Sequence, residues 1–170
     1  VADVATEAMA DEATPDERMA AEKLVAAAND TESPREMVDL LSRAQDAIAV
    51  GSVPALAAQR RIRARIDDVF ANAAPAVWQE PANAVAAVTY VLSGGAPDIL
   101  RSFLSMEPAP VVDERLPRGA LAYVEGRQGE AAGMLVDLDA ATLPARLGGQ
   151  VALAQAALLV GTDPKAALAR

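Results

Sequence analysis

The sequence predicts an all-α fold, an array of antiparallel helical hairpins. Three glycines, Gly94, Gly126 and Gly161, are spaced by 32 and 35 residues, and each separates a long alanine-rich apolar segment from a shorter one. This period is typical of helical-hairpin repeats. Tyr90 and Tyr123 lie in matching places before the first two glycines. We therefore expect TPR-like repeats that form a short solenoid.

Composition favours the same fold class. Hydrophobic residues make up 52% of the 170 residues, but aromatic residues only 3%, so the core must form by close packing of small side chains between helices. The chain has no Cys and no His, which excludes disulfides, thiolate metal sites and a histidine general base. Cysteine avoidance also fits an oxidising compartment. We expect no cofactor and no metal.

Charge divides the chain into two predicted parts. Residues 1–34 carry nine acidic and two basic residues, a net charge of −7 out of −9. We interpret them as an acidic tether that is partly helical, because Thr14 to Glu17 has the pattern of a capping box before a helix from about Pro15 to Ala28. The sequence pI of about 4.5 argues against nucleic-acid binding.

Residues 35–170 are predicted to form the helical-repeat domain, with hairpins at about 36–73, 81–106, 117–138 and 144–170. Ser33 to Glu36 repeats the start signal of a helix that Gly51 ends. The buried face expected for this helix and the next one has helical spacing and contains Met37, Leu40, Leu41, Ala44, Ile48, Ile62, Ile66, Val69 and Phe70.

The second helix of the first hairpin also carries a group of arginines: Arg60, Arg61, Arg63 and Arg65. A charge run on an amphipathic helix is usually a solvated face. Trp78 follows between Pro75 and Pro81 in an expected connection between hairpins. Its ring is either a buried hinge or an exposed anchor for a partner, and burial is favoured because Trp is highly buried on average.

The later elements follow from glycine and proline positions. A helix runs to the Gly94 turn, and Asp98 restarts the chain as a helix. Met106 to Pro117 holds too many prolines for a helix interior and is expected to be an extended connection. A further hairpin begins at Arg118, and a long helix opens at Leu143-Pro144 and ends at Gly161, with Asp163 and Pro164 starting another.

Both ends of the sequence suggest part of a longer protein. The chain begins at Val1 without Met or a visible signal peptide, as expected of a processed or recloned mature protein. It stops at Arg170 in the middle of an expected helix, which indicates a fragment of a longer array or a short capping helix. The longest apolar run, around Val151 to Val160, is shorter than the roughly 18 residues that span a bilayer.

Carboxylates do not form an evident catalytic pair. Asp67-Asp68 and Asp113-Glu114 are adjacent in sequence, and adjacent residues on a helix point in different directions. A glycan-cleaving enzyme needs two converging carboxyl groups about 5 to 10 Å apart. We therefore expect no enzyme activity.

Two segments carry a family resemblance. Residues 75–104 and 116–168 contain Trp78, a Leu-Ser-Gly-Gly turn at 92–95 and a Gly-Arg-Gln-Gly-Glu-Ala turn at 126–131. In the order and spacing of these features, residues 36 to 170 resemble the MotC family of periplasmic motility proteins of alphaproteobacteria. The resemblance implies an exported periplasmic protein that supports flagellar rotation by binding the periplasmic part of the stator protein MotB. It implies no enzyme activity, longer full-length members and no site residues.

Three hypotheses follow from the sequence: the motor interaction protein, a generic TPR-like adaptor that binds a peptide in its groove, and a carboxylate-dependent enzyme acting on glycans. For a binding protein, we expect the arginine group and Trp78 to form the partner-binding face, as a basic and aromatic surface on an acidic protein. An acidic partner surface would complement it. The sequence predicts no oligomeric state.

Overall fold

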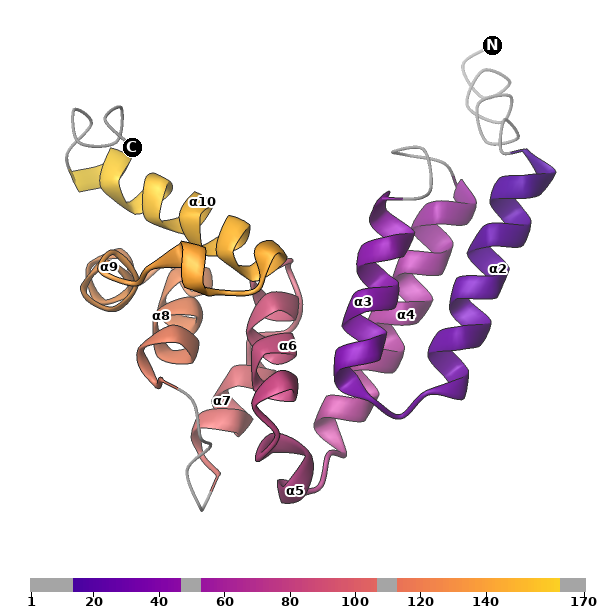
Figure 1. The fold of residues 1–170 in the computed structure, drawn as a ribbon, viewed down its shortest axis with the longest axis horizontal. Coiled ribbons are helices and arrows are strands. Elements are labelled where there is room, and N and C mark those ends of the chain that lie inside the picture. The colour runs from indigo at the N-terminus through magenta and orange to yellow at the C-terminus, as the bar shows by residue number, and fades with distance from the viewer. Residues whose placement is uncertain (1–13, 47–52, 107–112, 163–170) are drawn as a thin grey trace, which may run out of the picture. The chain divides into compact units, whose positions relative to one another are not determined.

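The computed structural model describes residues 14–46, 53–106 and 113–162, and this part of the chain is helical without strands. The all-α prediction is confirmed. Contacts between residues divide the chain into two units, Val1–Asn72 and Ala73–Arg170. Figure 1 shows the helices of each unit with their labels.

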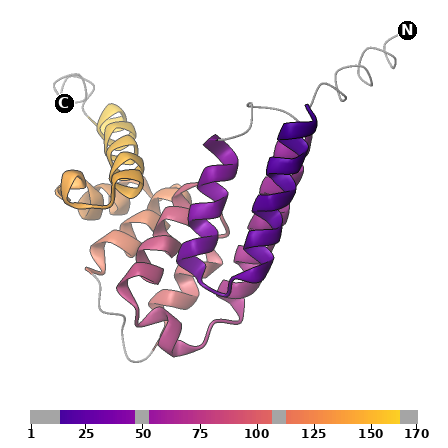
Figure 2. The same cartoon turned by 45° about the vertical axis from the view of Figure 1, so that its right-hand side comes forward.

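The first unit consists, in its described residues, of α2 (Pro15–Asp30), α3 (Pro34–Asp46) and α4 (Val53–Ala71). Each helix packs against the other two. Figures 1 and 2 show α3 running antiparallel to its neighbours, so that α2 and α4 run in the same direction. The core between them contains Leu24, Met37, Leu41, Ile62, Ile66 and Phe70, all at most 9% exposed. Full burial of each such side chain contributes about 1.5–3 kcal/mol.

Two polar signals start these helices. Thr14 and Glu17 form the predicted capping box, in which the Glu17 amide donates to the Thr14 hydroxyl at 3.2 Å and the Thr14 amide donates to the Glu17 carboxylate at 2.8 Å. At α3 the Glu36 amide donates to the Ser33 hydroxyl at 3.4 Å. The Glu36 carboxylate, however, accepts from the Thr31 hydroxyl at 2.6 Å, so this second box is only half formed.

The predicted tether boundary at residue 34 differs from the structure. Helix α2 buries Ala21, Leu24 and Ala28 and packs against both α3 and α4, so it belongs to the first unit. One leucine and two alanines suffice because alanine lets helices approach closely. Residues 1–13 lie outside the described residues.

The second unit contains, in chain order, α5 (Pro75–Trp78), α6 (Pro81–Leu92), α7 (Asp98–Leu104), α8 (Arg115–Val124), α9 (Gln128–Leu135), the short 3₁₀ helix η2 (Ala140–Thr142) and α10 (Ala145–Thr162). Helix α6 contacts α5, α7, α8 and α10. It buries eight of its twelve residues, and is therefore the centre of this unit.

Two turns of the second unit share one geometry. Gly94 (φ 87°) follows α6 and Gly126 (φ 75°) follows α8, both in the left-handed region. The Gly95 amide donates to the Tyr90 carbonyl at 3.0 Å, and the Arg127 amide donates to the Ala122 carbonyl at 2.8 Å. Both bonds span five residues, as in a Schellman motif. The repeat is imperfect, because Tyr90 corresponds in this geometry to Ala122 and not to Tyr123.

Three predicted boundaries differ from the structure. Pro117 lies in the first turn of α8, not in an extended connection, because a first-turn amide has no partner within its own helix. Gly161 lies within α10, which continues to Thr162. The expected connection around Trp78 contains the one-turn helix α5. Ile48, Gly51 and Asp163 lie outside the described residues.

Helices that follow one another in sequence pack together within the units. Helix α3 packs on α4, α6 on α7, and α8 on α9. Helix α10 packs on α9, η2 and α6, and it is the single helix of the described part of 144–170. Its Gln155 side chain donates to the carbonyls of Leu135 at 2.7 Å and Leu138 at 2.8 Å, which satisfies the C-terminal end of α9.

Candidate functional site

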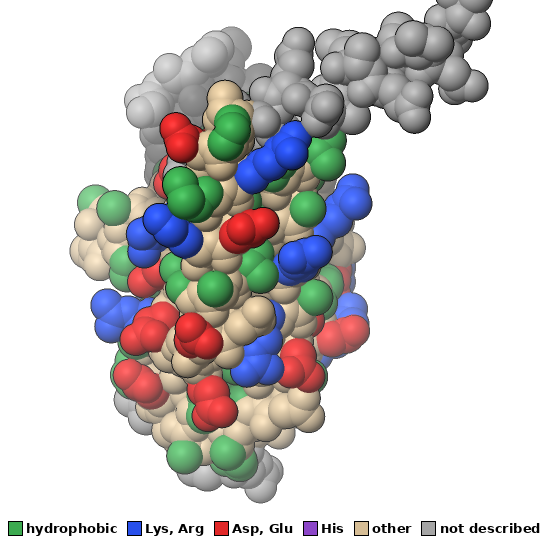
Figure 3. Space-filling view, turned by 90° about the vertical axis from the view of Figure 1, so that its right-hand side faces the viewer, with side chains coloured by type: hydrophobic (Ala, Val, Ile, Leu, Met, Phe, Trp, Pro, Cys, Tyr) green, Lys and Arg blue, Asp and Glu red, His purple; other side chains and the backbone are tan. Residues whose placement is uncertain are grey.

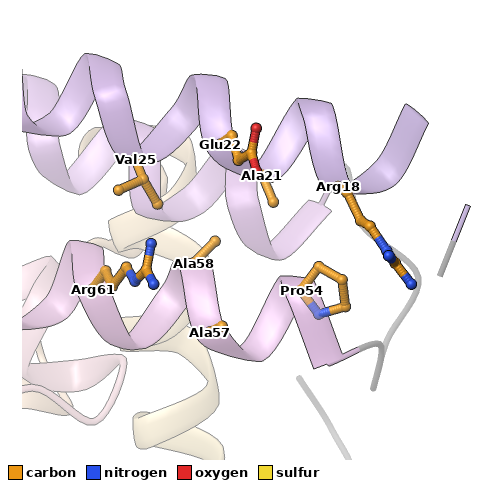
Figure 4. A pocket seen from close by; sticks show the side chains of 8 residues that line it. All are labelled: Arg18, Ala21, Glu22, Val25, Pro54, Ala57, Ala58 and Arg61. Carbon is orange, nitrogen blue, oxygen red and sulfur yellow. The ribbon is translucent and has the colours of Figure 1, made fainter. Parts of the chain in front are cut away.

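A groove lies between α2 and α4 in the first unit and encloses about 170 Å³. Each helix contributes four side chains at spacings of i, i+3, i+4 and i+7, which form one stripe along a helix. Because the helices run in parallel, Arg18 and Pro54 lie at one end of the groove and Val25 and Arg61 lie at the other (Figure 4). The groove is lined by Arg18, Ala21, Glu22, Val25, Pro54, Ala57, Ala58 and Arg61.

Small side chains create this groove. Ala21 is 5% exposed and Ala58 is 3% exposed, so they form an apolar floor below the charged residues. Larger residues at these positions would fill the space between the two helices. The groove is therefore a consequence of the alanine-rich composition.

The rim of the groove combines two arginines with one glutamate. Arg61 is exposed, and within the described part of the chain no ion pair joins it to Glu22 or to another carboxylate. A guanidinium offers several N–H donors in a planar fork that matches a carboxylate. The rim can thus bind an anionic group without first breaking an internal ion pair of Arg61.

The four arginines predicted as one basic face do not share one direction. Successive residues on a helix point about 100° apart. Arg61 lines the groove, and Arg60 is exposed outside it. Arg63 is half-buried. Arg65 forms an ion pair with Asp68 at 2.9 Å. Figure 3, in which the side of the first unit that carries α2 faces the viewer, shows basic and acidic side chains interspersed.

Trp78 lies in the core of the second unit. Its side chain is 1% exposed, and its ring packs against Phe103 with centroids 5.4 Å apart and planes tilted by 50°. This is the buried alternative that the sequence favoured. A buried ring gives a partner no surface in this structure, and a role of Trp78 in partner binding stays a prediction.

Arg18 and Glu22 were not predicted as site residues, because both lie in the segment interpreted as a tether. One signal could have found them. The apolar residues Ala21, Leu24, Val25 and Ala28 of this segment follow helical spacing after a capping box, which is the pattern of a packed helix.

A second cavity of about 340 Å³ lies between α2 and α3 and is lined by Ala27, Thr31, Glu36, Asp39, Leu40 and Arg43. The Thr31 hydroxyl donates to Glu36 within this lining. This hydrogen bond stabilises the start of α3. The cavity is therefore a consequence of the turn that joins α2 to α3.

The Glu125 carboxylate joins helix α7 to the turn after α8 in the second unit. The Glu125 carboxylate accepts from Arg101 Nε on α7 at 2.9 Å through one oxygen, and from Arg127 Nε at 3.0 Å through the other. Arg101 also pairs with Asp98, and Arg127 also pairs with Glu130. Hydrogen bonds from Arg127 and then from Arg101 lower the pKa of the Glu125 carboxyl below its ordinary value of 4.5.

This bridge predicts a pH-dependent stability. Because the folded pKa of Glu125 lies below the unfolded one, its contribution is fully present above about pH 4.5 and is lost as the pH falls through the lowered folded pKa. Glu125→Gln should lower the urea midpoint at pH 7 and leave a smaller difference at pH 3. Equal differences between the two proteins at both pH values would contradict the ionic role. Glu114→Gln, which removes the ion pair between the N-cap of α8 and Arg118, is the control.

Two adjacent carboxylates at the start of α8 also have structural partners. Asp113 pairs with Arg115 at 2.5 Å, which lowers the pKa of Asp113, and Glu114 pairs with Arg118 at 2.9 Å. The buried polar residues in the described ranges are Asn83, Thr89 and Gln155. Among residues 14–46, 53–106 and 113–162, no group of three or more His, Cys, Asp or Glu could hold a metal ion.

Comparison with known proteins gives the chain a family. Residues 2–170 match the family described as "Chemotaxis protein MotC". The chain belongs to the MotC family. It is 30% identical over 105 residues to the chemotaxis protein MotC of Rhizobium meliloti (strain 1021), across 61% of this chain and 24% of that protein. The matched segment thus spans about a quarter of the relative's length. No solved structure matches the chain.

The turns that carry the MotC resemblance both lie in the second unit. The Leu-Ser-Gly-Gly turn at 92–95 forms the first Schellman motif, and Gly126 to Ala131 contains the second and the start of α9. The Ser93 hydroxyl in the first turn accepts from the Gln150 amide of α10. Of the helices described, none is both long enough and apolar enough to cross a membrane.

Proposed function

We propose that this chain is a non-catalytic periplasmic protein that supports rotation of the flagellar motor by binding the periplasmic part of the stator protein MotB. Membership of the MotC family over residues 2–170 is the observation that carries the proposal. The relative from Rhizobium meliloti is named a chemotaxis protein. A sequence without cysteine supports the periplasmic location, because stray thiols are oxidised there.

Binding rather than catalysis agrees with the chemistry of the described side chains. The carboxylates that shift in pKa, Asp113 and Glu125, hold neighbouring arginines and are exposed or partly exposed. Catalytic carboxylates instead commonly lie in clefts, where burial and neighbouring charges shift their pKa values. Proteins built from packed helix pairs commonly bind partners on their surfaces.

The groove between α2 and α4 favours a second candidate function, a TPR-like adaptor that takes a peptide segment of its partner. In such an adaptor the parallel stripes of α2 and α4 would form the walls of the peptide-binding groove. This candidate differs from the first in partner and not in mechanism.

Location and motility can be tested together with Ser102→Cys, introduced into the full-length protein in a strain that lacks the gene. Ser102 is exposed on α7, so the thiol should be accessible. We expect normal swimming in soft agar, against no swimming without the gene, and labelling by a membrane-impermeant maleimide when the outer membrane is permeabilised. The unsubstituted protein is the control for labelling. Labelling only after lysis, or full swimming without the gene, would contradict the proposal.

A further inference from the structure

We propose that the groove between α2 and α4 binds an extended acidic segment of a partner protein, with one carboxylate on Arg18 and another on Arg61. The inference rests on the proposed function only in taking a protein as the partner. It does not require that the partner is MotB.

The size of the groove selects an extended chain. Its volume of about 170 Å³ is below the roughly 300–1,000 Å³ of small-molecule pockets. A helix is about 10–12 Å across with its side chains and would rest on the rim without reaching Ala21 and Ala58. An extended backbone is thinner, and it can lie over the alanine floor between the two helices.

The spacing of the arginines fits the period of such a chain. Arg18 and Arg61 lie at opposite ends of stripes that are seven residues long, which is about 10 Å along a helix at 1.5 Å per residue. Three residues of extended chain cover the same length at about 3.3 Å each. Side chains three apart on an extended chain point to opposite sides. Arg18 and Arg61 likewise stand on opposite walls, α2 and α4 (Figure 4).

The charge of the rim selects acidic ligands. Two arginines and one glutamate line the groove, on a chain whose net charge is −9. Arg61 is exposed and forms no ion pair within the described residues, so it can take a carboxylate directly. Glu22 can accept an amide hydrogen from the bound backbone, and the two arginines oppose the binding of basic segments.

Fluorescence anisotropy with short labelled peptides tests this inference. The probe is Gly-Asp-Ala-Ala-Asp-Gly, whose aspartates are three residues apart. One control peptide has the same composition with adjacent aspartates, and another has lysines in place of both aspartates. We expect saturable, salt-sensitive binding of the probe, at least threefold weaker binding of the adjacent-aspartate peptide, and none of the lysine peptide.

Variants of α4 locate the binding. Arg61→Glu should weaken binding of the probe peptide at least fivefold. Ala57→Leu should also weaken its binding, because leucine fills the groove without a change of charge. Arg60→Glu makes the same charge change one residue away, outside the groove, and should alter affinity less than twofold. No binding of the probe, equal affinity for both acidic peptides, or equal losses for Arg60→Glu and Arg61→Glu would overturn the inference.

The same variants separate this inference from the proposed function. If the periplasmic domain of MotB binds this chain equally well with and without Arg61→Glu, the groove is not the site and the proposed function stands. If the probe binds in the groove and the MotB domain does not bind, the proposed partner is wrong and the groove inference stands.

Discussion

Trp78→Ala is expected to unfold most of the second unit at 37 °C. The side chain is 1% exposed and its ring packs on Phe103, so truncation removes buried apolar area and leaves a large cavity. Such substitutions cost about 3–5 kcal/mol, against a total stability of about 5–15 kcal/mol for a domain. Since 1 kcal/mol shifts the midpoint of a domain of this size by roughly 4–8 °C, the midpoint should fall by more than about 12 °C.

Thermal unfolding followed by far-ultraviolet circular dichroism measures this effect, with Trp78→Phe as the matched variant. Phenylalanine keeps an aromatic ring next to Phe103, so the unfolding midpoint of Trp78→Phe should fall by less than half as much as that of Trp78→Ala. A drop below about 4 °C for Trp78→Ala would show that the ring does not support the core. If Trp78→Ala abolishes partner binding, the loss follows from unfolding, so this variant is a poor probe of an interface.

The second large effect concerns two adjacent glycines in α10, which should respond to alanine in opposite directions. A Cβ at Gly148 would lie 2.4 Å from the backbone oxygen of Ala140, whereas a Cβ at Gly149 would meet nothing within 4 Å. The carbonyl of Ala140 belongs to η2 and is not the end of a flexible side chain. Gly148→Ala should therefore push η2 away from α10 and destabilise the protein by about 1–3 kcal/mol.

Gly149→Ala is the control, because it makes the same chemical change on the same helix without the contact. Alanine in an exposed helix interior is favoured over glycine by about 0.5–1 kcal/mol, so this variant should be more stable than the parent. Urea unfolding of the two variants and the parent measures the difference. The account of how η2 packs is wrong if Gly148→Ala is as stable as Gly149→Ala.

Local signals in the sequence predicted the helix starts and turns correctly where a single stretch of chain decides them. The capping box of Thr14 and Glu17, and the glycine turns after α6 and α8, are each set by residues within six positions. A helix that begins at such a local signal then needs only an apolar face with helical spacing, which Met37 and Leu41 provide in α3.

Features that depend on packing between helices were harder to predict. The first helix looked like a tether because most of its residues are acidic or small, yet alanines on α2 and α4 allow a close approach that large residues would prevent. Pro117 looked like a break, but its position in the first turn of α8 removes the conflict.

The candidate site was predicted only in part for the same reason. The sequence placed four arginines together, but helical geometry spreads them around α4 and leaves Arg61 alone facing the groove. Its counterpart Arg18 comes from another helix, more than 40 positions earlier in the chain. Only the parallel arrangement of α2 and α4 brings them to one groove, and no pattern within either segment records that arrangement.

Titration calorimetry of this chain with the purified periplasmic domain of MotB from the same organism tests the central claim most directly. We predict saturable heat of binding that weakens at higher salt, a several-fold loss of affinity with Arg61→Glu, and little change with Arg60→Glu. Circular dichroism of each sample establishes that the helices are folded before the titration. Absence of saturable heat with a folded helical chain would contradict the claim that this protein binds the stator.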